Sequence, residues 1–153
     1  MSTIIEFLQK GVEAFEGLPK DEIDQLHSNV RQCFASGNRS RELLDTLIGD
    51  TGYYYAMLGN KLAQITAIKA SLARQVERNR LRIAKDANIS PKEKAQTERL
   101  ALQDEGHEKL QSQYDLIVGL EKFLSSARES LFMEHYALRN LTGDGAINRR
   151  INH

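Results

Sequence analysis

The chain of 153 residues contains no tryptophan, only two prolines, a single cysteine and no long apolar run. Few prolines together with 27% charged residues are typical of long exposed helices rather than of a β-sandwich or barrel. The lone Cys33 cannot form an intramolecular disulfide or a two-cysteine zinc motif, which favours a reducing cytoplasm. No apolar run approaches the roughly 18 residues that cross a bilayer, and the N-terminus lacks a signal-peptide pattern, so we expect neither secretion nor membrane insertion.

Short helical segments are predicted in the first 50 residues. The first covers about 3–16, and the second covers about 19–36, beginning at a proline and ending before a glycine. A third begins near Ser40 and meets "GDTG" at 49–52. Because each glycine costs about 1 kcal/mol in a helix interior, we expect a break or hinge at this stretch.

Two longer segments carry heptad repeats. The first covers about 52–87, where Leu58, Ile65 and Leu72 recur every seven residues. The second covers about 91–141 and carries a ladder of five apolar residues at the same spacing. These are Leu110, Ile117, Leu124, Leu131 and Leu138. Such repeats predict two long helices with coiled-coil-like seams.

The stretch "NISPKE" separates the two heptad segments. Ser90 is the expected N-cap, Pro91 the first helical residue and Glu93 the partner of a capping box. A short turn between long helices predicts an antiparallel hairpin. We therefore expect an all-α chain whose long helical hairpin at 52–142 and shorter N-terminal helices at 1–50 form one domain, followed by a flexible tail at 143–153.

The apolar stripe on these helices is wider than the heptad ladders alone. This surplus predicts either cover by the N-terminal helices or an interface in a homo-oligomer. "GYYYAMLG" at 52–59 places three tyrosines in three directions, so we expect at least one to be exposed or in an interface. The residues expected at the oligomer interface are Tyr54, Tyr55, Phe123, Leu131, Phe132 and Leu138.

Charge is unevenly distributed although it sums to zero. Residues 1–50 carry five basic and nine acidic side chains, whereas 69–99 carry nine basic and four acidic ones. Within "RQVERNRLRIAK" at 74–85, four basic side chains share the helix face opposite the apolar ladder, with a fifth on its flank. The predicted phosphate-binding residues are Arg74, Arg78, Arg82 and Lys85 on that face and Arg80 beside it. The alternative is a solvated helix face with local ion pairs.

Motifs for catalysis and metal binding are weak. Asp104 and His107 have the spacing of a carboxylate–histidine metal pair, but no second pair accompanies them, and we expect His107 at the surface. The chain has no glycine-rich phosphate loop, no HExxH and no nucleophile beside a convincing base. We therefore expect a non-enzymatic protein without a metal or cofactor.

The chain resembles the UvsY-type recombination mediator proteins of tailed bacteriophages over about 50–143. The matching stretches are "YYYAMLGNKLAQITAIKASLARQVERNRL" and "LQSQYDLIVGLEKFLSSARESLFMEHYALRNLTG". The family pattern is a tyrosine-containing amphipathic helix, a basic-x-basic-Leu element before a turn, and a long terminal helix with spaced Leu and Phe. The basic element corresponds to Arg78, Arg80 and Leu81.

This resemblance implies a mediator that binds single-stranded DNA and assembles into a ring-like homo-oligomer. It would help load a strand-exchange recombinase onto DNA occupied by single-strand-binding protein, in the cytoplasm of a phage-infected bacterium. The runner-up hypothesis is a helical adaptor or inhibitor that binds another protein and never touches nucleic acid. A structural coiled-coil component of a virion or cellular assembly is the third.

Overall fold

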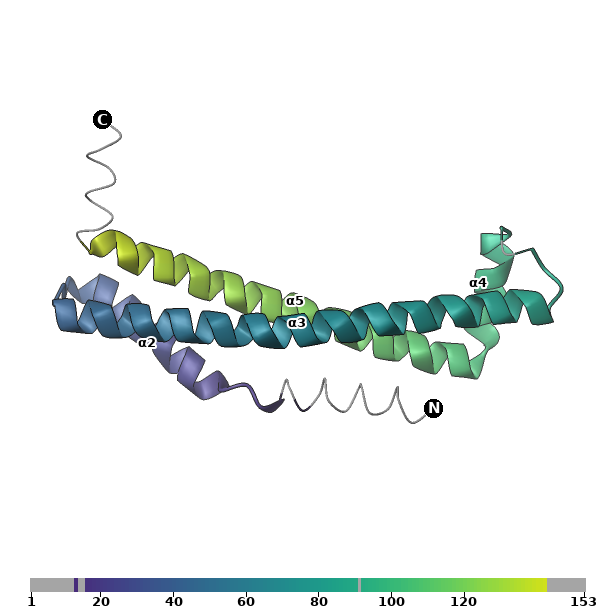
Figure 1. Ribbon diagram of the computed structural model, residues 1–153, viewed down its shortest axis with the longest axis horizontal. Helices are drawn as coiled ribbons and strands as arrows, with labels where there is room; N and C mark the ends of the chain where they lie inside the picture. The colour runs from purple at the N-terminus through teal and green to yellow at the C-terminus, as the bar shows by residue number, and fades with distance from the viewer. Residues whose placement is uncertain (1–12, 14–15, 91, 143–153) are drawn as a thin grey trace, which may run out of the picture. The chain divides into compact units, whose positions relative to one another are not determined.

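The computed structural model describes residues 13, 16–90 and 92–142. These described residues form four helices and no strand, which confirms the all-α prediction (Figure 1). The helices are α2 (Lys20–Ser36), α3 (Arg41–Asp86), α4 (Lys94–Gln103) and α5 (Glu105–Leu141). Among these four helices, none is both long and apolar enough to cross a membrane. The helix predicted at 3–16 and the tail at 143–153 lie outside the described residues, apart from positions 13 and 16.

The ends of α2 and the start of α3 follow the local sequence. Asp21 and Glu22 lie in the first turn of α2, where carboxylates complement the helix dipole. Gly37 closes α2 with a φ of 68°, a left-handed conformation that glycine adopts without steric cost. Ser40 then caps α3, because its Oγ accepts a hydrogen bond from the Leu43 N–H at 3.3 Å. These boundaries agree with the predicted ones.

Helix α3 continues through residues 49–52, so the break predicted at the two glycines is wrong. Thr51 is fully buried there, and its hydroxyl donates to the Leu47 carbonyl oxygen at 2.9 Å. A Cβ at Gly52 would lie 3.4 Å from His135 Cε1, so the glycine leaves room for this histidine of α5. Tertiary packing around Thr51 and Gly52 therefore outweighs the low helix propensity of glycine.

We expect Gly49→Ala to stabilise the protein by up to about 1 kcal/mol, because a Cβ at this helical position meets no atom within 4 Å. Gly59→Ala is the contrasting variant. Its Cβ would lie 3.0 Å from Arg128 Nε, and Arg128 lies over the Tyr55 ring at 4.1 Å. Chemical denaturation of both variants measures how far their free energies of unfolding differ. A loss of stability in Gly49→Ala would contradict an uninterrupted α3.

The prediction of one long C-terminal helix at 91–141 is wrong, because the helix is interrupted at Asp104. Asp104 adopts an extended conformation with φ −88° and ψ 114°, and its Oδ1 accepts a hydrogen bond from the His107 N–H at 2.9 Å. It therefore caps α5. The signal was present as "DEG", an aspartate followed by an acidic first-turn residue, just before the apolar ladder.

The capping box predicted at 90–93 does not form. Helix α4 begins at Lys94, with Glu93 at its N-cap and no side-chain cap. Ser90 Oγ instead accepts a hydrogen bond from the Lys92 N–H at 3.4 Å, within the turn. Pro91 lies outside the described residues.

The described residues pack as two units, and α3 and α5 contribute to both. We call them the α2 unit, with Gly17–Leu62 and 123–142, and the α4 unit, with Ala63–Lys122. Antiparallel contacts between α3 and α5 occur in each. In the α4 unit, the Thr66 hydroxyl donates a hydrogen bond to Glu121 Oε2 at 3.0 Å, and Asn79 Nδ2 lies 3.1 Å from His107 Nδ1.

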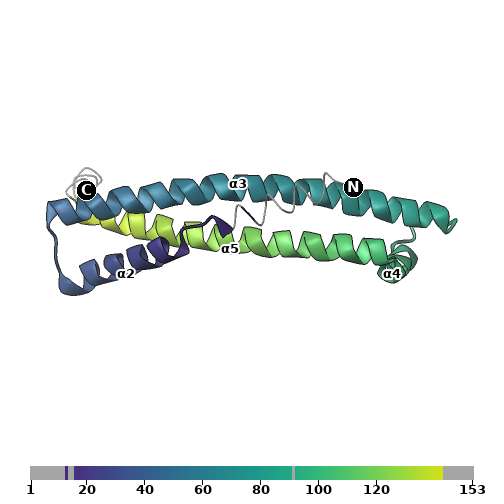
Figure 2. The same cartoon turned by 90° about the horizontal axis from the view of Figure 1, so that it is seen from below.

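In the α2 unit, α2 joins α3 and α5 (Figure 2). His27 Nδ1 lies 2.5 Å from Glu134 Oε1, which connects α2 to α5, and Thr51 Oγ1 lies 2.9 Å from His135 Nδ1, which connects α3 to α5. The heptad residues form much of the core of both units, with Leu110 only partly buried. The fully or almost fully buried ladder residues are Leu58, Ile65, Leu72, Ile117, Leu124, Leu131 and Leu138.

Candidate nucleic-acid interface

Four of the five predicted phosphate-binding residues are exposed on α3 in the α4 unit, and three of these four have no ion-pair partner among the described residues. Arg74, Arg78 and Lys85 form no ion pair with any described residue. Arg74 and Arg78 are four positions apart and thus lie on one face of the helix. The buried residues Leu72 and Val76 belong to the core side of the same stretch. This arrangement leaves three positive charges available to an external anion.

Arg80 has a different environment. Its side chain is 38% exposed, and its guanidinium NH2 lies 3.9 Å from Glu98 Oε1 on α4. The Nε atom is buried and has no hydrogen-bond partner among the described residues. Arg80, Glu98 and His107 contribute to the wall of a cavity of about 310 Å³ between α3, α4 and α5. The charge of Arg80 is therefore only partly compensated, and its hydrogen-bonding capacity is not fully used.

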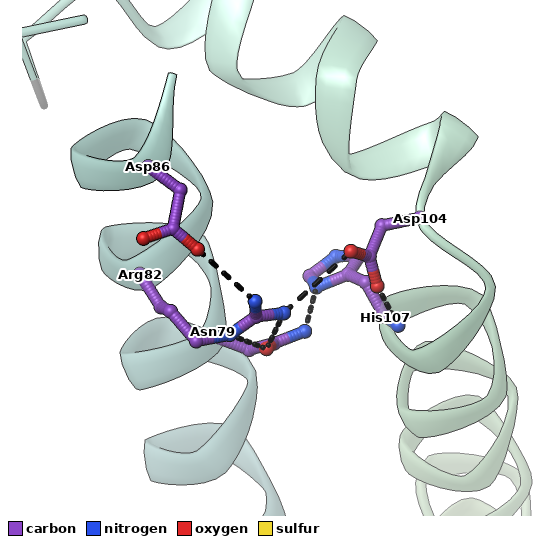
Figure 3. A network of polar contacts seen from close by, with 5 residues as sticks. All are labelled: Asn79, Arg82, Asp86, Asp104 and His107. Atoms are coloured by element: carbon purple, nitrogen blue, oxygen red, sulfur yellow. Dashed lines mark hydrogen bonds and ion pairs between the residues drawn. The ribbon is translucent and has the colours of Figure 1, made fainter. Parts of the chain in front are cut away.

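Arg82 is held by three neighbours (Figure 3). Its Nε and NH2 donate to Asn79 Oδ1 at 3.1 and 2.8 Å. Its NH1 donates to Asp86 Oδ2 at 3.4 Å, and its NH2 lies 3.5 Å from Asp104 Oδ2. Although half-exposed, Arg82 is thus shared between two carboxylates in the described structure.

His107 is buried, with 5% of its surface exposed, so its predicted place at the surface is wrong. Because Asn79 Oδ1 accepts from Arg82, the Asn79 amide nitrogen is the group that faces His107 Nδ1, at 3.1 Å. His107 Nδ1 is then an acceptor, as in the neutral imidazole. Burial, followed by repulsion from Arg80, lowers the pKa of His107, while the His107 N–H is the main cause that lowers the pKa of Asp104.

The lowered pKa of His107 predicts a loss of stability in mildly acidic solution. Below its ordinary value of 6.5, the unfolded chain takes up the proton before the folded one. The contribution of His107 is thus complete above this value and lost as the pH falls below it. We expect His107→Gln to flatten the dependence of the unfolding free energy on pH between roughly 7.5 and 5.5 relative to the wild type. If the unfolding free energy of the two proteins changed with pH in parallel, this would contradict the conclusion that His107 is buried in its neutral form.

Asp104 and His107 lie close together in space, but their polar atoms contact other groups. The Asp104 carboxylate caps α5 and pairs with Arg82, while His107 Nδ1 faces Asn79. Within the described ranges, no group of three His, Cys, Asp or Glu side chains could hold a metal ion. Asp104 and His107 instead contribute to the contacts between α3 and α5.

The six residues predicted at an oligomer interface divide into two sets. Leu131 and Leu138 are fully buried in the α2 unit, so their assignment to a surface is corrected. Phe123 and Phe132 are about half exposed, whereas Tyr54 and Tyr55 are partly buried. The heptad positions are filled by contacts within the chain, which explains why ladder residues are unavailable to a partner.

Aromatic side chains gather on the α2 unit. Phe132 lies 5.8 Å from Tyr55 and 6.4 Å from Tyr136 between ring centroids. Tyr136 and Met133 are 60% and 62% exposed. We call Tyr55, Phe132, Met133 and Tyr136 the aromatic patch. Tyr53, 61% exposed, is the outward tyrosine expected from the triplet.

The α4 unit thus carries exposed cations on α3 that have no ion-pair partner within 16–90 and 92–142, and the α2 unit carries an exposed aromatic patch. The cations can attract phosphates, and the patch can bury apolar area against another surface. Comparisons of the chain with protein-family models, with curated proteins and with solved structures find no match.

Proposed function

We propose that this protein binds single-stranded DNA through α3 and acts as a recombination mediator, helping to load a strand-exchange recombinase onto DNA covered by single-strand-binding protein. The observation that supports DNA binding most is that Arg74, Arg78 and Lys85 are exposed and form no ion pair with any described residue. The mediator role rests on the resemblance of 50–143 to UvsY-type proteins.

Binding by this surface is electrostatic and independent of base sequence. Lysine and arginine gain affinity for phosphates through release of counterions, which makes binding sensitive to salt. No aromatic residue occurs between Tyr55 and Tyr114 in the sequence, so this stretch of α3 supplies no rings on which bases could stack. Phosphate contacts, rather than base contacts, therefore carry the affinity.

Self-association would multiply these contacts. One protomer offers few phosphate contacts, but a homo-oligomer would present several such surfaces to one strand and raise the effective concentration of each. The aromatic patch supports this part of the proposal, since exposed apolar surface of this kind is typical of interaction sites. Phe123 and Phe132 are the predicted interface residues that remain exposed.

The aromatic patch also supports the second candidate function, a helical adaptor that binds another protein. Aromatic residues and methionine are enriched at protein interfaces, and Met133, Phe132 and Tyr136 expose about half or more of their surface. An adaptor of this kind would use the α2 unit and would not need the cations of α3.

Binding of a labelled oligothymidylate at several salt concentrations, with the mass of the protein measured in the same buffers, tests the proposal. We expect an oligomer whose affinity falls as salt rises, with a log-log slope of about −0.7 for each phosphate contact. A protein that binds no single-stranded DNA even at low salt would contradict the proposed function and favour the adaptor.

A further inference from the structure

Helix α4 is weakly attached to the rest of the α4 unit. It is 10 residues long and buries only two residues, Thr97 and Ala101. It starts without a side-chain cap, and its Leu102 is 80% exposed. Segments that bury little apolar surface open at a small free-energy cost, even where the surrounding core is stable. We therefore expect α4 to separate from α3 more easily than α5 does.

Two carboxylates at and after α4 lie over arginines of α3. Glu98 of α4 lies 3.9 Å from the Arg80 guanidinium, and Asp104, at the end of α4, lies 3.5 Å from that of Arg82 (Figure 3 for the second pair). Arg82 follows Arg78 by four positions, so it extends the face formed by the free arginines. These two carboxylates compete for two of the five predicted phosphate-binding residues.

Both ion pairs can be exchanged for phosphate contacts. The Arg80–Glu98 pair is long and about half exposed, and solvent weakens such pairs. The Arg80 Nε atom has no hydrogen-bond partner among the described residues, although it is buried. A phosphate that accepts charge-assisted hydrogen bonds from Arg80 and Arg82 would satisfy these donors better than the present partners do.

We propose that α4 and Asp104 form a displaceable acidic cover over Arg80 and Arg82, and that single-stranded DNA removes it as it binds. The cover lowers the affinity of the free protein for DNA and reserves two contacts for a strand already held by Arg74 and Arg78. This regulation rests on the proposed function, because its ligand is the same single-stranded DNA.

The variant Glu98→Gln with Asp104→Asn tests the cover. The Asp104→Asn change keeps a side-chain oxygen to cap α5, in place of Asp104 Oδ1, while the negative charge that faces Arg82 through Oδ2 is lost. We expect the double variant to bind an oligothymidylate more tightly than the wild type, by up to about fivefold for each ion pair that binding no longer has to break. The log-log slope stays similar, because both complexes make the same phosphate contacts.

The matched control is Glu105→Gln with Asp115→Asn, which removes the same charge from the same unit. Glu105 pairs with Lys109, and Asp115 accepts a hydrogen bond from Gln111, so neither pairs with Arg80 or Arg82. We expect its affinity for the oligothymidylate to stay close to that of the wild type. Equal gains in both double variants would show a general effect of net charge and would overturn the cover.

Hydrogen exchange on the unaltered protein gives an independent measurement. We expect the amides of α4 to exchange faster when the oligothymidylate is bound, because the helix leaves α3, while those of α3 do not. Unchanged or slower exchange in α4, in a protein that binds DNA, overturns the cover and leaves the proposed function standing. Absence of DNA binding by the wild type and the Glu98→Gln, Asp104→Asn variant alike overturns both proposals.

Discussion

Truncation of Leu131 to alanine is expected to lower the free energy of unfolding by about 2–5 kcal/mol. Leu131 is fully buried in the α2 unit, and its loss leaves a cavity among residues that relax only partly. Denaturant unfolding followed by circular dichroism measures the change. The control is Glu129→Ala, two positions away on α5 and exposed, which we expect to cost less than about 0.5 kcal/mol.

The concentration dependence of this loss distinguishes a core residue from an interface residue. Truncation of a side chain buried within its own chain lowers the free energy of unfolding by the same amount at low and high protein concentration. Truncation of a side chain at a subunit interface does not. Equal stabilities of Leu131→Ala and Glu129→Ala would contradict the placement of the heptad ladder in the core.

The second large effect concerns DNA. We expect Arg74→Ala with Arg78→Ala to weaken binding of single-stranded DNA about 25-fold at 0.1 M salt, because two phosphate contacts release about 1.4 fewer counterions per binding event. Both side chains are exposed and without an ion pair among the described residues, so their removal spares the folded contacts. Alanine also maintains the helix. Fluorescence anisotropy of a labelled oligothymidylate measures the loss.

Arg31→Ala with Arg41→Ala is the control for this variant. Both arginines are exposed on the α2 unit, and the variant has the same net charge as Arg74→Ala with Arg78→Ala. We expect it to retain DNA affinity within about twofold, since screening limits the reach of distant charges. A similar loss in both variants would show that only the net charge matters, and not the face of α3.

The sequence predicted the helical seams well because their signal is local and repeated. Leu58, Ile65 and Leu72 recur every seven residues, and only one side of a helix can present such a ladder to a core. The caps at Gly37 and Ser40 were also predictable, since each depends on residues within one turn of the helix end.

Helix continuity was predicted less well, because both packing between distant segments and local caps can override the helix propensity and periodicity of the sequence. Gly49 and Gly52 suggested a break, but Thr51 is buried beside His135, more than 80 positions away in the chain, and α3 continues. At Asp104 the apolar pattern favoured one uninterrupted helix. Asp104 Oδ1 instead accepts a hydrogen bond from the His107 N–H and caps α5, a local signal that the apolar pattern outweighed in the prediction.

The candidate site was predictable in its cations but not in their partners. A helical wheel placed Arg74, Arg78 and Lys85 on an outer face, and all three are exposed. The contacts of Arg80 with Glu98 and of Arg82 with Asp104 depend on how α4 folds back after the turn. No periodicity in the sequence encodes that direction, so these two ion pairs could not be predicted.

The central claim, that the outer face of α3 binds the phosphates of single-stranded DNA, is tested most directly by the salt dependence of binding. The measurement is the slope of log affinity against log salt for Arg74→Ala with Arg78→Ala, beside the wild type and Arg31→Ala with Arg41→Ala. We predict a slope shallower by about 1.4 in the first variant and unchanged in the last. Identical slopes for all three proteins would contradict the claim.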